Sequence, residues 1–324
     1  MNIFITGGAG FIGSHLAESY LATGHSVTIL DDLSTSSLTN LNAVLNHPKL
    51  TFIKGDILDD IRLEHLIQQA DCIFHLAAAV GVELVVNNPV RTITTNVLGT
   101  ERVLKFASEY SKRIIIASTS EVYGKSNKIP FHESDDLLIG APHLSRWSYA
   151  CSKLLDEFML MAYVRKSKLQ GTIVRFFNTV GPRQTGRYGM VIPRFVKSAL
   201  KNEPIMIYGT GQQTRCFCHV SDTVRALHAV AENLKTCGEV LNIGNTSSIS
   251  IYDLALLIKK KVASKSSLKI IPYEDAYESG FEDMIHRAPD CTKIQSLCNW
   301  RATITLDEII EDVANYLQKN NFQP

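Results

Sequence analysis

Thr6-Gly7-Gly8-Ala9-Gly10-Phe11-Ile12-Gly13 is the stretch that decides the fold of this 324-residue chain. The apolar residues before it predict a short strand, and residues 14–21 after it predict a helix. A strand that turns directly into a helix leaves the first N–H groups of the helix unpaired, so an anion can bind there. We expect Gly8 to allow the tight turn, Gly10 to let a pyrophosphate approach the backbone, and Gly13 to let helix and strand pack closely.

The second strand ends in two carboxylates. Residues 26–30 predict this strand, and Asp31 and Asp32 follow it. A carboxylate at this point can accept hydrogen bonds from both hydroxyls of an adenosine ribose, and it repels a 2′-phosphate. Residues 33–37 contain no arginine that could bind such a phosphate. The pattern therefore predicts a site for NAD rather than NADP, and the alternative is an ordinary glycine-rich turn after an apolar strand.

Composition and charge exclude several classes of protein. Lys+Arg 33 against Asp+Glu 32 gives a net charge of +1, which argues against a broad nucleic-acid-binding surface. The chain has no long apolar run, and its N-terminal strand leads straight into the glycine turn, so we expect neither a membrane span nor a signal peptide. The seven cysteines are scattered and no His/Cys cluster suggests a metal site, so we expect reduced thiols in a cytoplasmic protein.

Strands and helices alternate along the first half of the chain. We expect strands at 50–54, 72–76 and 113–117 and a long helix at 89–110. This alternation is typical of an α/β fold with a parallel, doubly wound (Rossmann) sheet, in which ligands bind beyond the carboxyl ends of the strands. Asp56 follows the third strand, where it could either meet an adenine edge or cap the next helix.

The fifth strand ends in hydroxyl and carboxyl side chains, from Ser118 to Glu121. Further along, Tyr149 and Lys153 are four residues apart in a predicted helix, so both project from one face. The ammonium is expected to lower the pKa of the phenol, with help from a bound nicotinamide cation, so that the phenolate can act as a general base near neutral pH. This spacing also arises by chance as an exposed pair, but the glycine turn and the strand end favour a catalytic role.

These motifs resemble those of the extended short-chain dehydrogenase/reductases that modify nucleotide sugars, over nearly the whole chain. The resemblance implies that Thr119, Tyr149 and Lys153 match the catalytic triad of that family. It also implies an NAD site to which Tyr149 and Lys153 belong. The other residues of this expected NAD site are Gly7, Gly10, Phe11, Ile12, Gly13, Asp31, Asp32, Asp56, Ile57, Leu76, Ala77, Ala78 and Asn96.

The second half of the chain fits a nucleotide-sugar site. The apolar stretch 188–196, which contains Val191 and Arg194, is of the kind that cradles a flat base. The resemblance assigns Arg215 to the pyrophosphate, and a planar guanidinium suits a bidentate phosphate contact; alone, this arginine would predict a surface salt bridge. The remaining residues expected to bind a UDP-sugar are Asn178, Tyr208 and Arg287.

The resemblance also predicts how the chain is divided and assembled. Residues 1–177 with about 219–245 are expected to form the NAD-binding domain, and about 178–218 with 246–324 a smaller α/β lobe for the nucleotide sugar. The helices around 89–110 and 149–166 have further apolar faces. Such helices pair into a four-helix dimer interface in this family, so we expect a homodimer; without the resemblance these faces would simply pack on the sheet.

Three positions discriminate between the reactions of this family, which begin with oxidation of a sugar hydroxyl, usually at carbon 4. Family 4,6-dehydratases carry an aspartate where Ser120 stands, which disfavours dehydration. Glu121 and Arg287 match positions of the UDP-glucuronate decarboxylases. A hexuronate oxidised at carbon 4 is a β-keto acid, which loses carbon dioxide. Arg287 could hold its carboxylate and the developing charge, and Glu121 could order or protonate nearby groups.

Other functions stay open beside UDP-glucuronate decarboxylation, which we favour. Ala150-Cys151-Ser152 and Ala288 depart from the strings usual in the decarboxylases, which leaves a UDP-glucose or UDP-glucuronate 4-epimerase as the alternative. Glu121 and Arg287 could simply form an ion pair between the lobes. A non-catalytic NAD-sensing regulator is the alternative of another class, and the intact triad argues against it.

Overall fold

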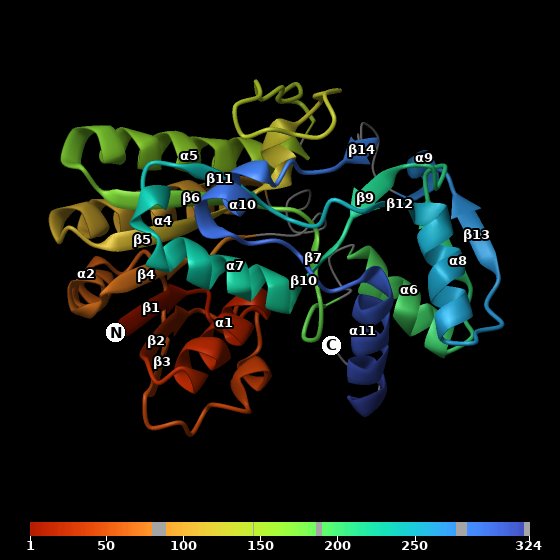
Figure 1. The fold of residues 1–324 in the computed structure, drawn as a ribbon, viewed down its shortest axis with the longest axis horizontal. Helices are drawn as coiled ribbons and strands as arrows, with labels where there is room; N and C mark the ends of the chain where they lie inside the picture. The colour runs from red at the N-terminus through yellow and green to blue at the C-terminus, as the bar shows by residue number, and fades with distance from the viewer. Residues whose placement is uncertain (80–88, 145, 186–189, 277–283, 321–324) are drawn as a thin grey trace.

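The large sheet of the protein has seven parallel strands in the order β11-β6-β5-β4-β1-β2-β3 (Figure 1). The computed structural model describes residues 1–79, 89–144, 146–185, 190–276 and 284–320. The strands are β1 (Asn2–Thr6), β2 (Ser26–Asp31), β3 (Leu50–Lys54), β4 (Cys72–His75), β5 (Arg113–Thr119), β6 (Gln170–Phe176) and β11 (Val240–Ile243). β1 pairs with both β2 and β4, so the strand order reverses beside β1 and a crevice opens at its carboxyl end. The predicted doubly wound sheet is confirmed.

Helices cover both faces of this sheet (Figure 1). One face packs against α1 (Phe11–Ala22), α7 (Val220–Glu232) and α10 (Thr292–Cys298). The other face packs against α2 (Asp60–Gln69), α4 (Pro89–Glu109) and α5 (Trp147–Ser167). Short 3-10 helices lie at η1 (Leu38–Leu41), η2 (Ser120–Tyr123) and η4 (Leu234–Thr236).

The isoleucines of β5 explain why both faces of this strand are buried. Ile114, Ile115 and Ile116 are fully buried. Because side chains alternate across a strand, Ile115 packs on the α1 side, and Ile114 and Ile116 pack on the α4 side. A strand that is apolar on both faces must be covered by helices on both, and β5 accordingly lies inside the sheet, between β6 and β4.

A second, smaller lobe lies beside the carboxyl edge of the large sheet (Figure 1). Its strands pair as β8 (Ile205–Tyr208) with β13 (Leu268–Ile271), as β12 (Ser248–Ser250), β9 (Thr214–Cys216) and β14 (His286–Arg287), and as β7 (Thr179–Val180) with β10 (Cys218–His219). Its helices are α6 (Val191–Leu200), α8 (Ile251–Lys261), α9 (Tyr273–Ala276) and α11 (Leu306–Lys319). α6, α8 and α11 bury a separate apolar core. The expected second lobe is confirmed, and its predicted residue boundaries stay a prediction.

Two further observations concern membrane-spanning helices and disulfide bonds. Within the described ranges, no helix is both long and apolar enough to cross a bilayer. All seven cysteines carry free thiols. The chain is therefore held together by its cores rather than by disulfide bonds.

Candidate active site

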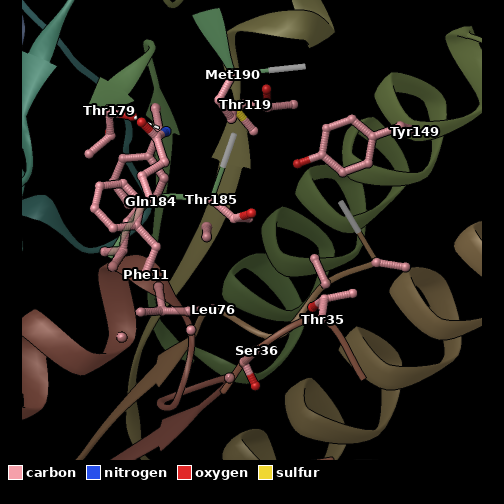
Figure 2. Close-up of a pocket in the computed structure, with 18 of the residues that line it drawn as sticks. Phe11, Thr35, Ser36, Leu76, Thr119, Tyr149, Thr179, Gln184, Thr185 and Met190 are labelled. Atoms are coloured by element: carbon pink, nitrogen blue, oxygen red, sulfur yellow. Dashed lines mark hydrogen bonds between the residues drawn. The ribbon is translucent and has the colours of Figure 1, made fainter. Parts of the chain in front are cut away.

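A cavity of about 710 Å³ lies between the carboxyl edge of the large sheet and the second lobe. Figure 2 shows Phe11 and Leu76 toward one end of it and Thr119 and Tyr149 toward the other, with the Tyr149 hydroxyl pointing inward. The lining therefore combines the glycine turn, the end of β5 and the N-terminal part of α5. These are the segments that sequence analysis assigned to a dinucleotide and to its chemistry.

The glycine turn brings the N-terminus of α1 to the cavity. Gly7 has a φ of +72°, and a Cβ on it would lie 2.7 Å from the backbone nitrogen of Ala77. The left-handed conformation belongs to Gly7. Gly8 is the next residue of the turn that the Gly10 N–H closes on the Gly7 carbonyl, and a Cβ on Gly8 would lie 2.7 Å from the Ile29 side chain. Gly13 has the predicted packing role, since its Cβ would lie 2.5 Å from the Gly7 carbonyl. Gly10 precedes α1, and within 4 Å its Cβ would meet only that carbonyl, at 3.1 Å.

The end of β2 supplies the carboxylates that were expected to meet a ribose. Asp31 is nearly buried and accepts hydrogen bonds from the Ala9 N–H at 2.9 Å, the Leu33 N–H at 2.9 Å and the Ser36 hydroxyl at 2.7 Å. Asp32 accepts one from a backbone N–H and also lines the cavity. The Ser36 contact marks where a ribose hydroxyl can replace a protein hydroxyl. An open helix N-terminus and an acidic strand end together fit a dinucleotide.

Asp56 and Asn96 have different positions relative to the cavity. Asp56 lines it together with Ile57, and its carboxylate accepts the Leu58 N–H. The alternative in which Asp56 caps the next helix is wrong, because Asp59 caps α2. Asn96 is buried in α4 and is not among the lining residues. Its side-chain oxygen accepts a hydrogen bond from the Ala79 N–H at 2.8 Å, so it stabilises the turn after β4. The expectation that Asn96 lines the NAD site is therefore corrected.

The three residues matched to the catalytic triad meet at one end of the cavity. Thr119 ends β5, and Tyr149 and Lys153 come from the first two turns of α5. The Thr119 hydroxyl donates a hydrogen bond to the phenol oxygen of Tyr149. Burial nevertheless raises the pKa of Tyr149, and the carboxylates of Glu121 and Asp156 raise it further.

The expected lowering of the Tyr149 pKa by Lys153 does not occur in the protein alone. The Lys153 ammonium donates a hydrogen bond of 2.7 Å to Asp156, and both side chains are buried. The carboxylate offsets the charge that was expected to act on the phenol. Sequence analysis missed Asp156, because a carboxylate on the third turn of a helix carries no motif.

Glu121 lies between two arginines in the cavity wall. Its Oε1 is 3.7 Å from Nη2 of Arg146 and 3.5 Å from Nη1 of Arg287, and both arginines are nearly buried. Arg287 lies on β14 in register with Arg215 on β9. The ion pair that was left as an alternative is therefore present, and it lies inside the site. Arg146 was missed as a site residue, and its only signal was its place three residues before Tyr149.

The second lobe lines the far end of the cavity. The Arg194 guanidinium lies over the ring of Tyr208, 4.0 Å from its centre, and both residues line the cavity with Val191, Asn178 and Arg215. Asn178 donates a hydrogen bond to a backbone carbonyl of β9, which fixes this wall. Residues 188 and 189 of the predicted base-binding stretch lie outside the described residues. Lining residues that sequence analysis missed include Arg183, Gln184, Phe217 and Tyr273.

Comparison with known proteins identifies the family. A family model described as GDP-mannose 4,6 dehydratase matches residues 4–313. The chain belongs to the extended short-chain dehydrogenase/reductases. The predicted resemblance is confirmed over nearly the whole length.

Two relatives and one solved structure show the degree of similarity within the family. A UDP-N-acetyl-alpha-D-glucosaminuronate decarboxylase of Bacillus cytotoxicus is 40% identical over 97% of each chain. A UDP-glucuronic acid decarboxylase 1 of Danio rerio is 32% identical over 98% of this chain and 72% of its own. A UDP-glucuronic acid 4-epimerase of Bacillus cereus, solved with UDP-glucuronic acid and NAD, superimposes with a TM-score of 0.88 over 99% of this chain and 100% of its own, at 29% identity.

Proposed function

We propose that this protein is an NAD-dependent decarboxylase of a UDP-linked hexuronate. The observation that carries the proposal is that the guanidiniums of Arg146 and Arg287 lie together in the cavity wall, both within 4 Å of the Glu121 carboxylate. Both guanidiniums line the cavity, and a guanidinium suits a bidentate contact with a carboxylate. Such a wall favours a substrate that carries its own carboxylate over a neutral hexose.

NAD fits the end of the cavity that the glycine turn forms. The N-terminus of α1 would hold the pyrophosphate, and Asp31 would hold the adenosine ribose in place of the Ser36 hydroxyl. NAD supplies a hydride acceptor when it is bound there. The NAD named with the Bacillus cereus epimerase supports this assignment.

The residues of the site divide the rest of the chemistry among them. Tyr149 takes the proton of the sugar hydroxyl, and Thr119 orients the phenol through its hydrogen bond. Arg287 and Arg146 bind the carboxylate of the substrate. A uronate with a ketone at carbon 4 releases carbon dioxide when the bond between carbons 5 and 6 breaks and its electrons form an enolate. The guanidiniums stabilise that enolate until a proton returns to carbon 5.

The relatives narrow the substrate to two hexuronates. Decarboxylases named for UDP-glucuronic acid are 32–34% identical to this chain, and the one named for the 2-acetamido uronate is 40% identical over 97% of its length. We therefore favour the 2-acetamido sugar over UDP-glucuronate. Incubation with each UDP-uronate and with UDP-glucose, with NMR of the products, tests this choice. A larger kcat/KM for the acetamido sugar supports it, whereas turnover of UDP-glucose alone contradicts the decarboxylase.

Two finer assignments belong to the same proposal. α4 and α5 pack against each other and expose Ile93, Leu98, Leu155 and Phe158 at their surfaces. Apolar side chains gathered on two neighbouring helices favour a homodimer in which these helices pair with those of a second copy. The free thiols favour the cytoplasm as the compartment.

A further inference from the structure

Asp156 is a buried carboxylate that touches the lysine of the Tyr149–Lys153 motif. The Lys153 ammonium lies 2.7 Å from Asp156 Oδ2, and the two side chains are 2% and 0% exposed. They are three residues apart on α5, so they project from the same side of the helix. A carboxylate at this depth is stable as an ion only when it is paired, so the two charges form one neutral unit.

The charges that face Tyr149 come from several elements. The carboxylate of Glu121, in η2, acts electrostatically on Tyr149, and Arg146 and Arg287 lie next to that carboxylate. The carboxylate of Asp156, on α5 itself, also acts on Tyr149. On the β4 side of Lys153 lies His75, whose imidazole is buried between hydroxyls and has its pKa lowered to about 3. His75 is therefore neutral at physiological pH. Lys153 and Asp156 thus form a buried ion pair on the helix that carries the phenol.

We propose that Asp156 is a positioning residue, which neutralises the Lys153 ammonium beside Tyr149 and so keeps the phenol protonated in the protein alone. The inference rests on the proposed function, because that function makes Tyr149 the general base. It concerns a property of the chain without substrate, because the ion pair is complete before any ligand binds. Activation of Tyr149 then requires positive charge beyond that of Lys153.

The experiment is an NMR titration of protein labelled with ¹³C at Cζ of tyrosine. Comparison with Tyr149→Phe identifies the signal of Tyr149. In the wild-type protein we expect this signal to stay that of a phenol through the alkaline range in which the fold persists. In Asp156→Asn and in Asp156→Ser, an unbalanced ammonium should lower the ionisation midpoint of Tyr149 by about one to three pH units.

Glu157→Gln is the matched control, because Glu157 is the next residue of α5 and forms an equally buried ion pair with Arg175 at 2.7 Å. We expect this variant to lose thermal stability without a change in the Tyr149 midpoint. Lys153→Met completes a cycle. In the wild-type background it should leave Tyr149 protonated, because Asp156 can take up a proton, and in the Asp156→Asn background it should raise the midpoint again.

Three results would overturn the proposal. The first is an unchanged midpoint in a folded Asp156 variant, and the second is an equal shift in Glu157→Gln. The third applies even if neither Asp156 variant folds: wild-type Tyr149 that ionises near neutral pH and no longer does so in Lys153→Met. Failure of the wild-type protein to decarboxylate either UDP-uronate would instead contradict the proposed function, and it would leave the titration intact.

Discussion

Glu121 shows how one side chain can specify a class of substrate. Its carboxylate alone would repel a uronate, but the guanidiniums of Arg146 and Arg287 lie beside it and can bind a substrate carboxylate. The arginines come from parts of the chain far apart in sequence, since Arg146 precedes α5 and Arg287 lies on β14. The site therefore exists only when the second lobe lies against the large sheet.

Replacing Arg287 by Gln should lower kcat/KM for the UDP-uronate by about ten- to a hundredfold, because one charged hydrogen bond to the carboxylate is lost. We expect Arg146→Gln to act in the same direction. Arg225→Gln is the control, because Arg225 pairs with Asp222 at the contact of α7 with the C-terminal segment. Steady-state kinetics with full activity in Arg287→Gln would remove this arginine from the reaction.

His75 should make the free energy of unfolding depend on pH. Burial lowers its pKa in the folded protein to about 3, whereas the unfolded chain binds the proton near pH 6.5. The unfolded state therefore holds more protons between these values, and stability should fall as pH decreases from 6.5, by up to about 1.4 kcal/mol per pH unit. Urea unfolding at several pH values measures this slope. His75→Gln should reduce it, and an equal slope in both proteins would refute the assignment.

The segment from β1 to α1 combines a constraint of folding with a constraint of binding. Gly7 needs a left-handed backbone and lies against Ala77, whereas a Cβ on Gly10 would make one tight contact, at 3.1 Å from the Gly7 carbonyl oxygen. The same short run therefore contains one glycine for the turn and one for the ligand. A sequence pattern predicts that the glycines matter, but four glycines among eight residues leave open which one takes the left-handed conformation.

Alanine substitutions should separate these roles. Gly7→Ala should destabilise the fold strongly, because both its φ of +72° and the 2.7 Å approach to Ala77 oppose a Cβ. Gly10→Ala should fold and lose about tenfold or more in NAD affinity by calorimetry, since a methyl group would stand before the helix N-terminus. Gly24→Ala is the control for backbone strain without a steric clash, because Gly24 has a φ of +83° but no atom within 4 Å of its Cβ position. It should cost less stability than Gly7→Ala. Normal NAD binding by Gly10→Ala would place the pyrophosphate elsewhere.

The elements themselves could be predicted well, and their ends less so. The strands of the large sheet are near-continuous apolar runs, so their order of appearance and type followed from the sequence. The expected helix at 14–21 begins at Phe11, because Gly10 already allows the chain to enter a helix, and the helix expected to open at Tyr149 begins at Trp147. Such boundaries depend on caps and packing rather than on periodicity.

The proposed homodimer depends on the exposed apolar side chains of α4 and α5. Phe158 is 63% exposed there, and replacing it by Glu should convert a dimer into a monomer in light scattering, because a buried charge would have no partner in the interface. Ile61→Glu is the matched control, since Ile61 is 85% exposed on α2. A wild-type monomer at micromolar concentration would contradict the proposed homodimer.

The two lobes together explain what the sequence could predict of the site. The motif residues Thr119, Tyr149 and Lys153 reached one cavity, because parallel strands end at one edge. The neutral pair of Lys153 with Asp156 could not be predicted, since it depends on how deeply α5 is buried. The place of Arg146 in the site could not be predicted for a similar reason, because it depends on the fold that brings Glu121 next to it.

The central claim is that the substrate loses its carboxyl carbon in this cavity. The most direct measurement is ¹³C NMR of the wild-type protein incubated with NAD and a UDP-hexuronate labelled at carbon 6. We predict that the label appears as carbon dioxide and bicarbonate while a UDP-linked pentose or 4-ketopentose accumulates. A label that stays in the sugar, with inversion at carbon 4, would contradict the account and establish an epimerase.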